Sequence, residues 1–158
     1  MLIQIKRGRD GASTLACLRD DGSRTWARLH RFFPQHDLTH CAVESVLGFD
    51  QAFFGLVGSG WQLDDFTLPA LRSRLPDEAI LAETIVALLD VERGTGHVMP
   101  GDEFNAALGD SLREQRARAE RRVTNDELDA IRRLRDQLVA RWDTVAPGDT
   151  LEVSFPHT

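Results

Sequence analysis

The sequence lacks the features that would mark a membrane protein or a disulfide-stabilised secreted protein. It has two cysteines, Cys17 and Cys41, without a Cys-x-x-Cys spacing, so neither a disulfide framework nor a cysteine-rich zinc site is indicated. No apolar run approaches the length of a membrane span, and residues 1–6 do not form a signal-peptide pattern. Internal repeats and low-complexity tracts are also missing. We therefore expect a soluble protein of the reducing cytoplasm, with no membrane partner.

Positive charge is scarce over the middle of the chain. The 158 residues carry a net charge of −6, and residues 32–111 hold thirteen acidic but only three basic side chains. A negative field over this stretch favours cations over anionic substrates and nucleic acid. The arginines of residues 112–142 are interleaved with acidic side chains, which is typical of a solvated helix face. We therefore expect no nucleic-acid partner.

The overall composition is that of one globular domain. Hydrophobic residues make up 42% of the chain and charged residues 28%, both ordinary values for a globular protein. A chain of 158 residues is long enough to bury a substantial core. We therefore predict a single domain over residues 1–158.

Short apolar or alternating segments near both ends of the chain predict a small sheet. Residues 2–5, 15–19 and 25–29 have this pattern, and the turn at residues 20–23 is a hairpin signal. Residues 151–155 alternate like the first segment, so the first and last strands are expected to pair. Strands and helical segments are segregated in the sequence. This predicts an α+β fold, with a small antiparallel sheet of three N-terminal strands and one C-terminal strand packed against about four helices.

Start and stop signals place the helices. Helices are predicted over residues 34–47 and 76–93, each opened by a proline and followed by a glycine. A Thr-x-x-Glu capping box at residues 124–127 opens a further amphipathic helix. Residues 51–57 are apolar and lie among glycines, which fits either a loop that lines a pocket or a short helix in a tightly packed corner, and we favour the corner. Three aromatic side chains of this corner are expected in the core: Phe53, Phe54 and Trp61.

The helix over residues 34–47 carries a polar stripe. An α-helix advances about 100° per residue, which brings His36, His40 and Glu44 to adjoining positions on one side. Apolar residues occupy both faces of this helix, so we expect it to be buried. Buried polar side chains must be satisfied by hydrogen bonds or by a metal ion.

Two histidines four residues apart on one helix face can bind one metal ion. Nitrogen–metal distances of about 2.0–2.1 Å suit a zinc ion between them. We therefore predict that His36 and His40 bind a divalent metal, with zinc as the leading choice. A third ligand would have to come from elsewhere in the chain. The candidates are Glu83, His97, Asp64 and Asp65.

Asp37 and Glu44 are the candidate catalytic residues. Asp37 stands where zinc peptidases of the His-Glu-x-x-His type have a general-base glutamate, but its side chain is one methylene shorter. We interpret it as a base or a further ligand. The Cα atom of Glu44 is about 12 Å along the helix axis from that of His36, too far for the two to share an ion. Glu44 is therefore expected to orient His40.

Two resemblances arise from these residues. His36, Asp37 and His40 form a His-Asp-x-x-His pattern that is similar to the zinc motif of a ubiquinone-biosynthesis family. That motif has a glutamate twelve residues beyond its second histidine, where this chain has Ala52, so the resemblance stops at His36, Asp37 and His40. The Phe-Pro-x-His-Asp-Leu-Thr-His…Val-Glu stretch, within residues 33–61, resembles a family of small uncharacterised bacterial proteins. That resemblance implies no particular activity.

Three functional hypotheses follow from the sequence. The first is a divalent-metal-binding protein or metal-dependent hydrolase that acts on a small-molecule substrate. The second is a non-catalytic binding or interaction protein, in which the stripe is a buried hydrogen-bond network. A homo-oligomer is a further partner expectation under any of the hypotheses. The third is a thiol-dependent enzyme that uses Cys41. Neighbouring helix positions point about 100° apart, so His40 is poorly placed to activate this thiol.

Overall fold

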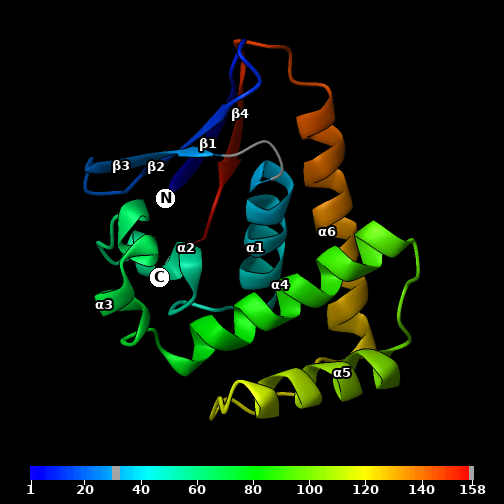
Figure 1. Cartoon of the computed structure of the whole chain (residues 1–158). Coiled ribbons are helices and arrows are strands. Elements are labelled where there is room, and N and C mark those ends of the chain that lie inside the picture. Colours follow the sequence, from blue (N-terminus) through cyan, green and yellow to red (C-terminus); the bar gives the residue numbers. More distant parts are fainter. Residues whose placement is uncertain (30–32, 157–158) are drawn as a thin grey trace.

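The four predicted strands form one antiparallel sheet. The computed structural model describes residues 1–29 and 33–156. Strands β1 (Leu2–Arg7), β2 (Ser13–Leu18), β3 (Arg24–Leu29) and β4 (Thr150–Ser154) lie in the order β3-β2-β1-β4 (Figure 1). In β1, Ile3 lies opposite Cys17 on one side and Val153 on the other. The predicted pairing of the first and last strands is therefore confirmed.

One face of the sheet is buried and the other is exposed. Ile3, Ile5, Leu15 and Cys17 are at most 1% exposed, whereas Trp26 is 62% exposed. Side chains alternate between the two faces of a strand, so the four buried residues belong to one face and Trp26 to the opposite one. The helices gather on one side of the sheet (Figure 1). Each fully buried aliphatic side chain of the inner face contributes roughly 1.5–3 kcal/mol.

The helices lie between the third and fourth strands of the chain. The described residues form α1 (Phe33–Leu47), α2 (Phe53–Gly58), the 3₁₀ helix η1 (Leu63–Thr67), α3 (Pro69–Arg72), α4 (Asp77–Thr95), α5 (Gly101–Glu114) and α6 (Asn125–Asp143). Four of them, α1, α4, α5 and α6, have 14 or more residues, and this set corresponds to the predicted number. The α+β fold is thus confirmed, and the short helices are additions to it. No helix in the described part of the chain is long and apolar enough to cross a membrane.

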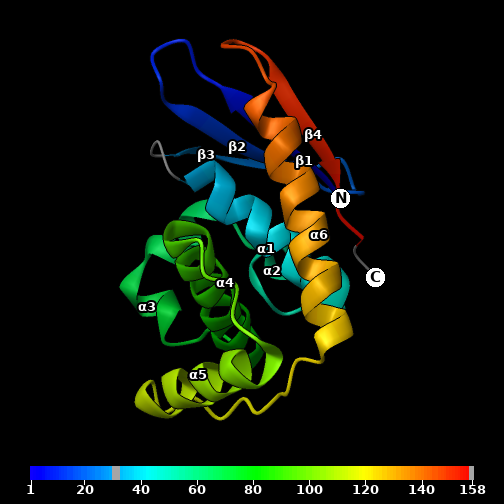
Figure 2. The same cartoon turned by 90° about the vertical axis from the view of Figure 1, so that its right-hand side faces the viewer.

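Helix α1 is the central helix of the fold. It lies between the sheet and the α4–α5 pair, and α6 runs along its side (Figures 1 and 2). Leu38, Ala42 and Val43 are at most 1% exposed, and the polar His40 and Glu44 are buried as well. The expectation of a helix buried on both faces is confirmed. Because protein interiors are densely packed, this environment holds the polar side chains of α1 in fixed positions.

The predicted corner after α1 forms α2, but only part of it is core. Phe54 is fully buried, as expected. Phe53 and Trp61 are only half-buried, so the expectation that they belong to the core is wrong. Phe53 packs against the buried cluster from outside it, with its ring 5.4 Å from that of His40. The corner therefore places aromatic surface beside the polar stripe.

The corner depends on a close backbone approach at Gly55. A Cβ atom there would lie 2.3 Å from the carbonyl oxygen of Asp50. We expect Gly55→Ala to lower the free energy of unfolding by about 1–3 kcal/mol, because the backbone itself must move. Gly94→Ala is the matched control, since an added Cβ in that part of α4 meets nothing within 4 Å. Urea unfolding of both variants measures the difference, and equal stabilities would contradict the close approach.

Candidate metal centre

His36 and His40 lie side by side on α1. Their ring centroids are 4.9 Å apart, with an interplanar angle of 72°. Side chains four residues apart on a helix are neighbours, so the spacing in the sequence accounts for this contact. The side chain of His40 is 5% exposed and that of His36 is 25% exposed. The histidine pair is thus reached by solvent from the side of His36.

Helix α4 adds a carboxylate to the histidine pair. The Oε2 atom of Glu83 lies 3.0 Å from Nε2 of His40, and its Oε1 atom lies 3.9 Å from Nε2 of His36. Potential ligand atoms of these three residues all lie within 4.8 Å of one another, and they form the only such group of three among the described residues. The side chain of Glu83 is 58% exposed. The sequence analysis named all three residues, and the packing of α1 against α4 brings them together.

The other ring nitrogen of each histidine also faces a carboxylate. Nδ1 of His36 lies 2.8 Å from Oδ2 of Asp90, and Nδ1 of His40 lies 3.2 Å from Oε1 of Glu44. When the imidazoles are neutral, Nδ1–H can donate to these carboxylates and the Nε2 lone pairs then face Glu83. Carboxylates that hold metal-binding histidines in this way fix both the ring orientation and the tautomer.

Glu44 holds more than one partner in place. Its side chain is fully buried. While Oε1 faces His40, Oε2 accepts hydrogen bonds from the backbone N–H groups of Phe54, at 2.9 Å, and Gly55, at 3.1 Å. Glu44 thus connects the imidazole to the first turn of α2. The predicted function of orienting His40 agrees with this geometry.

The separations from Glu83 to the two histidines are close to those between two ligands of one metal ion. Two ligand atoms that each lie about 2.1 Å from an ion, in tetrahedral arrangement, are about 3.4 Å apart. The distances from Glu83 to His40 and His36, 3.0 and 3.9 Å, lie on either side of this value. The three residues therefore form a group that could hold a metal ion.

The charges of the site favour a cation between the carboxylates. Burial alone would lower the pKa of His40, but the hydrogen bonds and charges of Glu44 and Glu83 outweigh it and raise the pKa to about 10. The hydrogen bond from His40 lowers the pKa of Glu83. Burial works against ionisation of Asp90, but the hydrogen bond from His36 keeps its pKa below the ordinary value. Without a metal, His40 is thus a cation, and a metal ion must displace its Nε2 proton.

Asp37 lies beside this group without belonging to it. Its side chain is buried, and its Oδ2 atom has no hydrogen-bond partner among the described residues. Burial raises the pKa of Asp37 to about 7, against the opposing charges of His40 and His36. Its oxygens are not among the ligand atoms that lie together. A function as a base or further ligand stays a prediction.

The remaining ligand candidates lie in other surroundings. His97 is exposed, with Nε2 3.1 Å from Oε1 of Glu103. Asp64 and Asp65 lie in η1, where Asp65 accepts a hydrogen bond from the backbone of Gln62 in a capping box. The structure does not bring these three candidates to the histidine pair.

Cys41 is unsuited to thiol chemistry in this structure. It is 2% exposed. Burial raises its pKa to about 12, so the thiol stays protonated at neutral pH. Because the thiolate is the nucleophile, the hypothesis of a thiol-dependent enzyme loses its support.

Asp90 is the one residue of the centre that the sequence analysis did not assign. It follows Glu83 by seven residues on α4, a spacing of about two turns that keeps both side chains on one face. This shared face was visible in the sequence, but its orientation toward α1 was not. Arg93 and Gln35 extend the connection, since Arg93 donates to Asp90 at 3.2 Å and to the Gln35 side chain at 2.7 Å.

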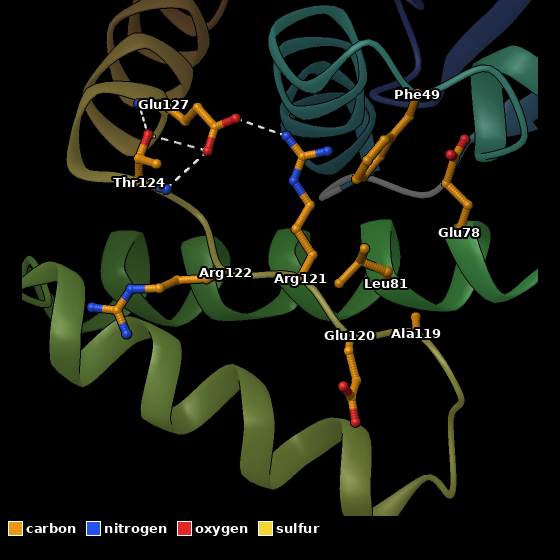
Figure 3. Close-up of a pocket in the computed structure, with 9 residues that line it drawn as sticks. All are labelled: Phe49, Glu78, Leu81, Ala119, Glu120, Arg121, Arg122, Thr124 and Glu127. Carbon is orange, nitrogen blue, oxygen red and sulfur yellow. Dashed lines mark hydrogen bonds and ion pairs between the residues drawn. The ribbon is translucent and has the colours of Figure 1, made fainter.

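An open groove lies at the other end of α1. Figure 3 shows it between α4, α5 and the segment that leads into α6, with Phe49 and Arg121 among its lining residues. Its volume is about 520 Å³. The guanidinium of Arg121 lies 5.3 Å from the Phe49 ring centroid and 2.7 Å from Oε1 of Glu127. These contacts attach the α5–α6 connection to α1, and the groove shares no residue with the histidine group.

The histidine group thus combines three potential ligands, two oriented imidazoles and access to solvent. Similarity to other proteins gives no further indication of its use. No protein-family model matches the chain, and no curated protein or solved structure matches it either.

Proposed function

We propose that this chain binds a divalent metal ion through Nε2 of His36, Nε2 of His40 and the carboxylate of Glu83. The convergence of these atoms supports the proposal most strongly. Both imidazoles have Nδ1 beside a carboxylate, and both present Nε2 to the same third side chain. Such a pattern is typical of histidines that bind metals.

Zinc is the ion that fits this set of ligands best. Two imidazole nitrogens and one carboxylate are a set that zinc has in catalytic sites, where the fourth coordination position stays open. Glu83 is 58% exposed, so the outer side of the group is accessible to water and to a small molecule. The surrounding carboxylates of Asp90 and Glu44 compensate the charge of a divalent cation.

Hydrolysis is the chemistry that an open position on such an ion supports. When bound, the metal would supply a Lewis acid and an activated water. Asp90 and Glu44 would hold the imidazoles in orientation. Asp37 would be the proton acceptor, since its buried Oδ2 atom has no hydrogen-bond partner among the described residues. We therefore propose a metal-dependent hydrolase.

Non-catalytic binding is the second candidate function, and one observation favours it. The raised pKa of His40 describes a protonated imidazole between Glu44 and Glu83, which satisfies all three groups without a metal. In that case the stripe would stabilise the fold, and the function would lie in a partner-binding surface.

Metal content distinguishes the two candidates. Untagged wild-type protein and the His36→Ala/His40→Ala variant would be purified without chelators and compared by elemental mass spectrometry. We expect near-stoichiometric zinc in the wild type and none in the folded double variant, because two of three ligands are removed. A hydrolase screen of the zinc-loaded protein follows.

His97→Ala is the matched control for this experiment. It removes an exposed histidine that also lies beside a glutamate, Glu103, and should leave the zinc content unchanged. Absence of zinc, manganese and iron from the wild type, even after incubation with each ion, would contradict the proposal. Loss of thermal stability in the double variant would then favour the hydrogen-bond network.

A further inference from the structure

Aromatic rings continue the row of the two imidazoles. The ring centroid of Phe53 lies 5.4 Å from that of His40. In the row of ring contacts, His40 therefore stands between His36 and Phe53. The ring of Phe66 lies 4.6 Å from Phe53, and that of Trp61 lies 5.5 Å from Phe66. Five rings thus follow one another, with the candidate metal ligands at one end and three apolar rings at the other.

The three apolar residues are packed but not fully buried. Phe53, Phe66 and Trp61 are each half-buried, so each residue keeps some surface exposed to solvent. A side chain that only filled the core would be buried like their neighbour Phe54, which is 0% exposed. We call these three rings the aromatic strip.

The backbone around the aromatic strip is held to the sheet. The guanidinium of Arg19, on the turn after β2, donates to the carbonyl oxygens of Val57 and Trp61, both at 2.5 Å. The backbone N–H of Leu63 donates to Oγ1 of Thr25 in β3 at 3.1 Å. Glu44 fixes the first turn of α2, which carries Phe53. A strip held at both ends offers a surface that is formed before a ligand arrives.

The charged side chains around the row of rings limit the net charge of a ligand that this surface would accept. The side chains of Glu83 and Asp90 lie at the histidine end of the row, where their carboxylate oxygens are 3.0 Å from Nε2 of His40 and 2.8 Å from Nδ1 of His36. A divalent ion there would offset two of these negative charges. The Arg19 guanidinium beside the strip is buried and already donates to the carbonyl oxygens of Val57 and Trp61, so a neutral or cationic molecule fits better than an anion.

We propose that the aromatic strip binds a flat apolar group, such as a phenyl ring, of a neutral or cationic substrate whose hydrolysable bond lies at the metal. This inference rests on the proposed metal site. Stacking on Phe53, Phe66 and Trp61 would hold the apolar group, since aromatic pairs prefer ring separations of about 4.5–7 Å. The metal and the strip would together select the substrate.

Hydroxamic acids test the proposal without requiring catalysis, because they bind zinc directly. Acetohydroxamic acid and phenylacetohydroxamic acid would be titrated calorimetrically into the zinc-loaded protein. We expect the phenyl compound to bind about tenfold more tightly or better, because its ring is buried against the strip. Trp61→Leu and Phe66→Leu should each reduce this ratio several-fold while the zinc content stays that of the wild type.

Trp26→Leu is the matched control, because Trp26 is an exposed tryptophan on the opposite face of the sheet. It should leave the ratio unchanged. Equal affinities of the two compounds for zinc-loaded wild type would overturn the aromatic strip and leave the metal site intact. A protein that takes up no zinc would overturn both proposals. A ratio that is unchanged in folded Trp61→Leu and Phe66→Leu would also contradict the strip.

Discussion

Glu44→Ala is expected to lower the free energy of unfolding of the metal-free protein by about 3–5 kcal/mol, the range for breaking a buried ion pair. Glu44 is fully buried, and its two oxygens have three partners: Nδ1 of His40 and the backbone N–H groups of Phe54 and Gly55. Alanine would leave two buried donors unsatisfied and would remove a charge that stabilises protonated His40. Urea unfolding at pH 7 measures the loss.

Two further variants separate the contributions of Glu44. Glu44→Gln keeps an oxygen for the N–H groups of α2, but it removes the charge and turns an NH2 group toward Nδ1 of His40. It should cost less than the alanine variant, because the two N–H groups stay satisfied. Glu103→Ala breaks the exposed contact with His97 and should change the stability by less than about 1 kcal/mol. If Glu44→Ala and Glu103→Ala lower the free energy of unfolding by equal amounts, the buried network around Glu44 does not stabilise the fold more than an exposed contact does.

The sheet could be predicted from the sequence because its signals are local. Alternation within residues 2–5, 15–19 and 25–29 depends on the period of the strand, and the turn at residues 20–23 fixes one hairpin. The fourth strand was expected to pair with the first because both alternate alike, and β4 does pair with β1. The short helices η1 and α3 have no comparable periodicity, so they were not anticipated.

The candidate site could be predicted only as far as one helix extends. His36, His40 and Glu44 share α1, and the helical repeat alone places them on one side. The third potential ligand was one of four candidates, because only the packing of α1 against α4 decides which side chain approaches. Asp90 lies 54 positions along the sequence from His36, its hydrogen-bond partner. No local sequence pattern predicts a contact between residues so far apart in the chain.

The surroundings of the corner were misjudged for a related reason. Phe53 and Trp61 are apolar, and apolar residues among glycines predict a packed core. Their partial exposure depends on where α2 and η1 end relative to α1, which is a property of the tertiary structure. Half-buried aromatic rings beside a polar group therefore could be recognised only from the fold.

Zinc is expected to stabilise the protein by an amount that increases with pH. At a free zinc concentration of about 1,000 times Kd, the gain in free energy of unfolding is about 4 kcal/mol. Zinc must displace the proton of His40, whose pKa is raised to about 10. At a fixed free zinc concentration, each pH unit below about 10 should therefore tighten zinc binding about tenfold. Each unit should also add about 1.4 kcal/mol to the free energy of unfolding.

The metal-free protein should show the opposite dependence on pH. A histidine whose pKa is raised from 6.5 to about 10 in the folded state contributes stability that is complete below pH 6.5 and is lost as the pH rises toward 10. Asp37, with its pKa raised to about 7, likewise favours the folded state more at low pH. Unfolding curves should be measured at pH 6 and pH 8.5, with a chelator and with buffered zinc. The difference in free energy of unfolding between zinc and chelator should be larger at pH 8.5. Stabilisation by zinc that is independent of pH, or that persists in His40→Gln, would show that the ion binds elsewhere.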